Sequence, residues 1–246
     1  MATLIWTGGE SATSKTFMTA ANWGGTAPTN DDTLIINSTS DTIKGAATGL
    51  TGITFRVGSG FTGTIGTSTT YLDLDGPLCE FASGGAAAYL TGTWTNFRIT
   101  GGSASSVFLN LKGNASTAIT TLLASQLSGT VTVGSSAAVT TVQMNGLSVG
   151  KIDLASSITG LANLTVTEGT IACASTISGT ASVIGGTLQT SGTSAYPTIE
   201  IDTDGSCDYR SSGTITTLNI FDGVFSSRDN ETAGFTITTA NNYSGG

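Results

Sequence analysis

Apolar and polar residues alternate in short segments that recur through the second half of the chain. In three segments an alternating apolar pair is followed by glycine and another apolar residue at the same spacing. These begin at Leu164, Ala181 and Leu218 and reach Gly169, Gly186 and Gly223. Related segments start at Val142, Ile199 and Phe235 without the full glycine spacing. The six starts are therefore separated by 22, 17, 18, 19 and 17 residues.

Self-similarity at about 20 residues is typical of a solenoid. The repeating unit here is strand-like, because its apolar positions alternate and β-branched residues are common in it. We therefore predict an all-β fold, a single-stranded parallel β-helix with right-handed coils. A β-sandwich or jelly roll is the alternative fold, although it does not impose one strand-turn motif at near-constant spacing.

Aligning the last five segments by their starts predicts which residues stack on one another, about 4.8 Å apart. One inward column contains Leu164, Ala181, Ile199, Leu218 and Phe235, and a second contains Val166, Val183, Ile201, Ile220 and Ile237. The outward column between them contains Thr165, Ser182, Glu200, Asn219 and Thr236. We expect the recurrent glycines at turns, where the backbone takes a positive φ.

The first 33 residues differ from the rest, because they hold two of the three tryptophans, Trp6 and Trp23. A solenoid needs a terminal cap that covers its first apolar layer and its unpaired strand edge. We therefore divide the chain into an N-terminal cap at residues 1–33 and a parallel β-helix at residues 34–246. Between residues 34 and 140 strands are evident, but their phase is less regular, as expected if some corners carry longer loops.

Composition and charge limit the classes of molecule that this protein is expected to bind. The chain has 246 residues, a hydrophobic fraction of 38% that suffices for a narrow core, and 34 glycines. Sixteen acidic residues outnumber eight Lys and Arg, which gives a net charge of -8, and the basic residues are scattered singly. Nucleic-acid binding requires clustered basic residues. We therefore expect no nucleic acid and no anionic membrane as a partner, and favour a neutral or cationic protein surface or an uncharged glycan.

Neither a signal peptide nor a membrane-spanning run is expected. The N-terminus has no basic segment followed by an apolar one, and no run of 18 apolar residues occurs. The three cysteines, Cys79, Cys173 and Cys207, have no tight spacing and cannot all pair. Cys173 lies two residues after the inward Ile171, so we expect it to point inward as a buried free thiol. Such thiols fit assembly in a reducing cytoplasm.

The chain contains no histidine, which removes Ser-His-Asp and Cys-His catalysis and every metal site that needs histidine. The remaining catalytic possibility is a carboxylate pair, Glu200 and Asp202, about 7 Å apart on the outward face of one strand. No neighbouring repeat supplies a third acid in register, so solvated surface residues are the preferred interpretation. Asp202, Asp204 and Asp208 also suggest a calcium loop, but they lack the order of an EF-hand, and a polar turn is preferred. We expect no catalytic residues, no cofactor and no metal.

Aromatic residues are the other candidates for binding. Stacking on aromatic rings could bind a sugar, but the candidate rings show no regular spacing, so packing at the corners is the preferred interpretation. They are Tyr71, Tyr89, Trp94, Tyr196 and Tyr209.

A resemblance appears near the N-terminus. Trp6-Thr7-Gly8-Gly9, then Ala21-Asn22-Trp23-Gly24-Gly25, Pro28 and Asp31-Asp32 together resemble the opening of many bacterial and phage β-helix proteins. These include pectin-lyase-like and autotransporter-passenger-like proteins and virion surface proteins. The likeness covers about 30 residues, and it implies the β-helix fold.

With the apparent lack of a signal peptide and the sparse charge, this resemblance leads us to expect a non-enzymatic phage protein. The expected role is capsid decoration, with the major capsid protein or another virion protein as partner. We expect a homotrimer, located in the virion and assembled in the host cytoplasm. The alternatives are a tailspike-type module that binds or cleaves cell-surface glycans, and a bacterial adhesin.

Overall fold

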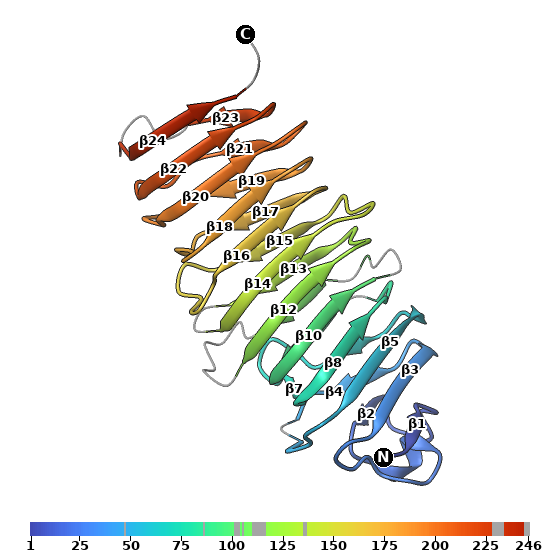
Figure 1. Ribbon diagram of the computed structural model, residues 1–246. Helices are drawn as coiled ribbons and strands as arrows, with labels where there is room; N and C mark the ends of the chain where they lie inside the picture. Colours follow the sequence, from blue (N-terminus) through green and yellow to red (C-terminus); the bar gives the residue numbers. More distant parts are fainter. Residues whose placement is uncertain are drawn as a thin grey trace.

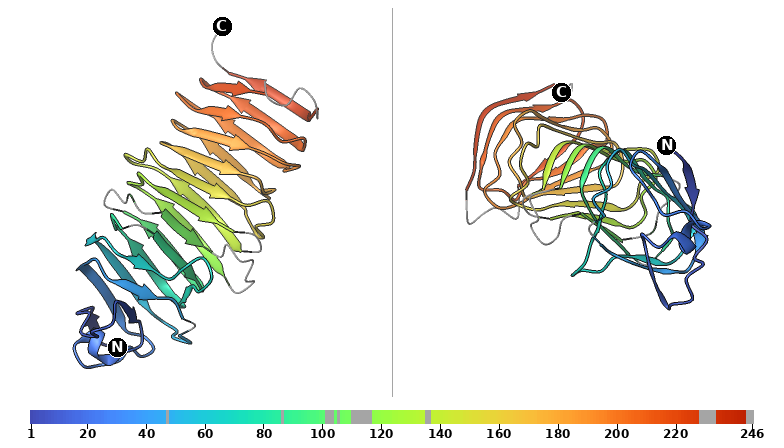
Figure 2. Two further views of the ribbon diagram at one scale, coloured as in Figure 1. Left: turned by 180° about the vertical axis from the view of Figure 1, so that it is seen from behind. Right: turned by 90° about the horizontal axis from the view of Figure 1, so that it is seen from below.

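The structure, a computed structural model, describes residues 1–46, 48–85, 87–100, 104, 106–109, 117–134, 137–227 and 234–243. The chain forms one elongated stack of coils, with the N-terminus at one end and the C-terminus at the other (Figure 1). Views from behind and from below show successive coils following one another around a shared interior (Figure 2). The fold is a β-solenoid, as the repeating apolar pattern predicts.

Two sheets run the length of the stack. In the described residues the first sheet consists, in spatial order, of β1 (Thr3–Ile5), β3 (Thr33–Thr39), β5 (Thr54–Phe61), β8 (Gly76–Phe81), β10 (Thr93–Ile99), β12 (Ala118–Ala124), β14 (Ala138–Met144), β16 (Asn163–Val166), β18 (Thr180–Val183), β20 (Tyr196–Ile201), β22 (Thr214–Ile220) and β24 (Thr236–Asn242).

The second sheet consists, in the same part of the chain, of β2 (Ser14–Thr16), β4 (Thr42–Lys44), β6 (Thr64–Ile65), β9 (Ala87–Thr91), β11 (Ser106–Leu109), β13 (Thr130–Val133), β15 (Lys151–Leu154), β17 (Thr170–Cys173), β19 (Thr187–Thr190), β21 (Ser206–Asp208) and β23 (Val224–Ser226). A short strand, β7 (Leu72–Asp73), also pairs with β9. The 3-10 helix η1 (Ala20–Trp23) lies near the N-terminus.

Every pair of neighbouring strands in the two sheets, as far as the structure describes them, is parallel. The chain alternates between the sheets, so each strand pairs with the strand of the same sheet one coil away. This arrangement excludes the β-sandwich and jelly roll, which are built from antiparallel strands.

The predicted inward columns are confirmed as far as the penultimate coil. Val142, Leu164, Ala181, Ile199 and Leu218 stand in register on successive strands of the first sheet and are buried. In the second column Val166, Val183 and Ile201 are likewise in register and buried, whereas Ile220 is in register but only partly buried. Cys173 points inward as expected. Alternation with a buried face therefore fixed the register over these coils.

The prediction for the last coil is wrong. Leu218 stands beside Ala240 rather than Phe235, and Ile237 stands beside Ile215. The outward position assigned to Thr236 is likewise taken by Asn241. Residues 235–237 alternate like the start of the repeat, but they belong to the part of the strand that precedes a corner.

The same corner recurs in several strands of the first sheet. Ile119 and Leu122 are both buried although they are three residues apart, whereas Thr120 between them is exposed. A straight strand would place residues three apart on opposite faces, so β12 bends between its two threonines. The same apolar-Thr-Thr-apolar sequence occurs in β14 and β22, with the same burial pattern.

The recurrent glycines are required mainly because a side chain at these positions would clash with a neighbouring coil. A Cβ added to Gly186 would meet the side chain of Val166, and one added to Gly223 would meet Ile201, in each case an inward residue of a neighbouring coil. Only Gly169 of the three motif glycines has a positive φ, of 69°. The expectation that positive φ explains these glycines is therefore correct for Gly169 and wrong for the other two.

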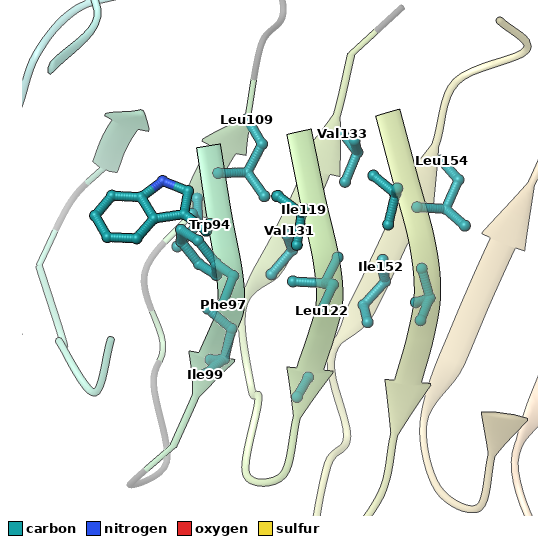
Figure 3. Packing of buried hydrophobic residues seen from close by; sticks show 14 of the residues in the cluster. Trp94, Phe97, Ile99, Leu109, Ile119, Leu122, Val131, Val133, Ile152 and Leu154 are labelled. Atoms are coloured by element: carbon teal, nitrogen blue, oxygen red, sulfur yellow. The ribbon is translucent and has the colours of Figure 1, made fainter. Parts of the chain in front are cut away.

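The core fills the interior between the sheets. Figure 3 shows Phe97 and Leu122 of the first sheet and Val131 and Ile152 of the second together in this interior, on successive coils. All three cysteines are free and buried, and burial raises the pKa of each thiol. A thiol that stays protonated is a poor nucleophile and metal ligand.

An aromatic cluster lies at the N-terminal end of this core. The rings of Trp6 and Trp23 meet edge to face at 5.0 Å, and Phe17 lies 5.2 Å from Trp23 and 6.0 Å from Phe55. The buried Asn22 donates to the carbonyl of Thr16 and to Glu10. The first 33 residues thus contribute Trp6, Phe17 and Trp23 to this cluster. They also contain β1 and β2, which pair with β3 and β4.

Two carboxylates fix the same segment. Asp32 accepts hydrogen bonds from the backbone of Ala2 and from Thr29. Asp41 accepts one from the Trp6 indole at 2.9 Å and lies 3.4 Å from the Lys15 ammonium. Burial acts to raise the pKa of each carboxyl, but hydrogen bonds and nearby positive charge outweigh it, so both pKa values lie below 3.8.

The columns of the first sheet generate a stability prediction. Val183→Asp should prevent folding, because an unpaired carboxylate in this narrow apolar core costs about 4 kcal/mol or more. Thr165→Asp, an outward position on the same sheet, is the matched control and should leave the melting temperature within a few degrees. Circular dichroism during heating measures both, and a folded Val183→Asp protein with an unchanged melting temperature would contradict the assigned register.

The Asp41 contacts generate a prediction about pH. A carboxyl with a lowered pKa stabilises the fold above its unfolded pKa of about 3.8, and this contribution is lost as pH falls through the folded pKa. Asp41→Asn should therefore cost about 1–2 kcal/mol at pH 7, and its deficit relative to the unmodified protein should shrink below pH about 3.8. Urea unfolding at pH 7 and pH 3 measures this, with the exposed Asp204→Asn as control. A deficit that stays constant with pH would refute the role of the Asp41 charge.

Candidate binding surface

The outer face of the first sheet is lined by small polar side chains. Thr180, Thr198, Thr217 and Thr239 stand in register on β18, β20, β22 and β24. Thr121 and Thr141 hold the equivalent place in β12 and β14. Threonine suits this position because its branched side chain packs on the pleated surface while its hydroxyl remains outside.

A second outward column lies two residues further along each strand. Ser182, Glu200, Asn219 and Asn241 are in register there. The amide of Asn241 donates to Asn219 at 3.0 Å, and that of Asn219 contacts Glu200 at 3.5 Å. Asn241, Asn219 and Glu200 are thus linked along the stack, and Glu200 is the one charged residue among these four positions.

The charged part of the same column lies nearer the N-terminus. Arg56 and Glu80 form an ion pair at 2.9 Å, and Arg98 stands in register on the other side of Glu80. A hollow of about 270 Å³ is lined by this pair together with Ile35, Asn37 and Gly58, among others. Because the charges here already neutralise each other, this hollow has no strong preference for an ion of either sign.

The predicted carboxylate pair lies in a different hollow near the C-terminal end. Glu200 is half-buried in β20, and Asp202 follows the strand as an exposed residue. Both line a hollow of about 110 Å³ with Ser182, Ile184 and Phe221. Asp202 accepts hydrogen bonds from the backbone and hydroxyl of Thr203. The structure therefore brings the two acids together beside an exposed aromatic ring.

The remaining acids of the suggested calcium loop do not join them. The backbone turns between Asp202 and Gly205, where Asp204 has a φ of 61°. Asp208 lies in β21 of the second sheet and pairs with Arg210 at 2.6 Å. Among the described residues, no group of three acidic, cysteine or histidine side chains is placed to hold a metal ion.

The aromatic candidates separate into core and surface. Trp94, Tyr196 and Tyr209 are fully buried and belong to the core, so the preferred interpretation, packing, is confirmed for these three. Tyr71 and Tyr89 instead lie on the outer side of the second sheet, half-buried, with ring centroids 5.9 Å apart.

Three further surface aromatics, Phe108, Phe221 and Tyr243, were not among the candidates from the sequence. Phe108 stacks on Tyr89 at 4.7 Å and extends that group to three rings. Tyr243 stacks on Phe221 at 4.9 Å, with an angle of 11° between the rings. The position of Phe108 between two inward residues, Val107 and Leu109, is the sequence signal that identifies it as outward. Tyr243 had no such signal, because its position depends on the register of the last coil.

In the described part of the chain, no helix is long and apolar enough to cross a membrane. No protein-family model matches the chain, and no curated protein or solved structure matches it significantly. The solenoid itself and the side chains on its outer faces are therefore the features from which a function can be inferred.

Proposed function

We propose that this protein is a non-enzymatic structural protein of a phage virion, a decoration protein that binds and stabilises the capsid surface. The observation that carries the proposal is the long outer face of the first sheet, with its column of threonines at matched heights. Such a surface presents many short polar groups on a rigid frame and suits a broad protein contact, which we assign to the other copies of a trimer that binds the shell as one unit. The resemblance of the N-terminal segment to virion surface proteins supports the same class.

Binding without catalysis is supported by the chemistry of the side chains. The sequence has no histidine to act as a base, and its buried thiols have raised pKa values. Glu200 and Asp202 lie on an open face beside Phe221 rather than in a deep cleft, whereas glycosidases bury the reacting bond between their two acids. Free cysteines also agree with assembly in the reducing cytoplasm of a host.

A homotrimer is the proposed assembly. The threonine column carries no charge, so bringing it against another copy avoids the desolvation of Lys or Glu. Closed threefold symmetry would use one such face per copy and would prevent open-ended growth. Three copies also suit the threefold positions of an icosahedral shell, where three weak contacts act together.

Glycan binding in a tailspike-type module is the second candidate function. It is favoured by the outward group of Tyr71, Tyr89 and Phe108 on the second sheet. Aromatic faces bind sugar rings through their apolar C–H faces. Tyr89→Ala would abolish glycan binding in this case but would leave capsid binding unchanged.

Two measurements test the proposal. Light scattering should give three times the chain mass of 24.6 kDa, and Thr198→Arg should dissociate the trimer because it places a charge in the contact. Thr187→Arg, at an outward position of the second sheet, is the matched control and should remain trimeric. A monomeric mass at micromolar concentration would refute the trimer.

The second measurement uses empty capsids of the phage that encodes the protein. The protein should sediment with them at a fixed stoichiometry and raise their resistance to heat, whereas Thr198→Arg should bind more weakly through lost avidity. Absence of co-sedimentation, or release of sugars from the host polysaccharide by the purified protein, would overturn the proposed function.

A further inference from the structure

A slot is present on the outer face of the first sheet near its C-terminal end. Ile184, Asp202, Phe221 and Tyr243 follow the ends of β18, β20, β22 and β24, each linked to the preceding coil by a backbone hydrogen bond. Ile184 and Phe221 are 41% and 40% exposed, and the short Asp202 lies between them. Two steps of about 4.8 Å separate the two apolar walls, which leaves room for one planar group between them.

The ring that forms one wall is held in place. Tyr243 stacks on one face of Phe221, so the opposite face is the one that lines the slot. The aliphatic side chain of Ile184 forms the other wall, and the carboxylates of Glu200 and Asp202 lie between the walls.

The chemistry of this slot favours a cation. Ionised carboxylates only accept hydrogen bonds, and the face of an aromatic ring attracts positive charge. No salt bridge to Glu200 or Asp202 occurs among the described residues, in contrast to Glu80 on the same face. The sequence between Lys151 and Arg210 contains six acidic residues and no Lys or Arg.

We propose that this slot binds an arginine side chain of a partner protein. A guanidinium group is planar, stacks on aromatic rings and donates parallel hydrogen bonds to carboxylates, so it can occupy the space between Ile184 and Phe221 and meet Asp202 and Glu200. The aliphatic part of the arginine would lie along the apolar wall. A lysine ammonium lacks the planar shape, and a neutral sugar does not use the excess of negative charge.

This inference rests on the proposed function in one respect, that the partner is a protein. The slot lies at the ends of the first-sheet strands and begins at Glu200, two residues beyond Thr198 of the threonine column. The shell contact at the slot would thus lie beside the trimer contact at the threonines. The slot would give the contact a specific anchor that the polar face lacks.

The test uses the full chain with methyl-labelled isoleucine and the probe peptide acetyl-Gly-Arg-Gly-amide at low salt. The Ile184 methyl signal should shift in a saturable way. The same peptide with citrulline, which has a similar shape but no charge, should produce no comparable shift. Binding should weaken as salt is raised, because the site is open to solvent.

Substitutions locate the binding. Asp202→Asn and Phe221→Ala should each weaken binding about two- to fivefold, as expected for an exposed ion pair and an exposed cation–π contact. Asp204→Asn is the matched control, because it removes the same charge two residues away at a side chain outside the slot, and it should have a smaller effect than Asp202→Asn. Unchanged melting temperatures would show that all three variants remain folded.

Three outcomes would overturn the inference: equal binding of the citrulline peptide, equal loss in Asp202→Asn and Asp204→Asn, or an Ile184 shift with maltotriose but not with the arginine peptide. Capsid binding separates this inference from the proposed function. If the peptide binds in the slot but no capsid does, the slot stands and the capsid role fails. If capsids bind the Phe221→Ala protein as tightly as the unmodified one, the slot is not the anchor.

Discussion

The backbone hydrogen bonds between successive coils determine the geometry of everything else in this protein. Each strand pairs in parallel with the strand one coil away, which sets a step of about 4.8 Å along the stack. Side chains at equivalent positions must then touch their counterparts above and below. This one constraint explains the apolar interior columns, the glycines that would otherwise meet a neighbouring coil, and the matched heights of the outward side chains.

The register could be predicted from the sequence where the inward residues are apolar and the spacing is nearly constant, as from Val142 to Leu218. It could not be predicted for the last coil. There Ala240 and Asn242 occupy positions that are apolar in the preceding coils, while Phe235 and Ile237 supply a better alternating pattern five residues earlier. Alternation alone cannot distinguish the two sides of a corner, because both have a period of two residues.

Fewer of the surface contacts could be predicted from the sequence, because they also depend on the register between coils. Glu200 and Asp202 were found because alternation identified them as outward, and the structure places both in one hollow. The pairing of Phe221 with Tyr243 depends on contacts between coils 22 residues apart in sequence, and these follow only from the correct register of β24. Trp94, Tyr196 and Tyr209 belong to the core, as their irregular spacing favours, but aromatic character by itself does not distinguish them from the outward Tyr71 and Tyr89.

The two ends of the stack differ in how firmly they are closed. At the N-terminal end, Trp6 and Trp23 donate their indole N–H groups to Asp41 and to the carbonyl of Phe17. At the other end, Phe225, Phe235 and Ile237 are only partly buried in the part of the chain that the structure describes. Because each coil is stabilised chiefly by its immediate neighbours, this difference gives the rod a mechanical polarity. Within the described residues, the coils next to the tryptophans are therefore expected to resist a pulling force longer than the coil that contains Phe225 and Phe235.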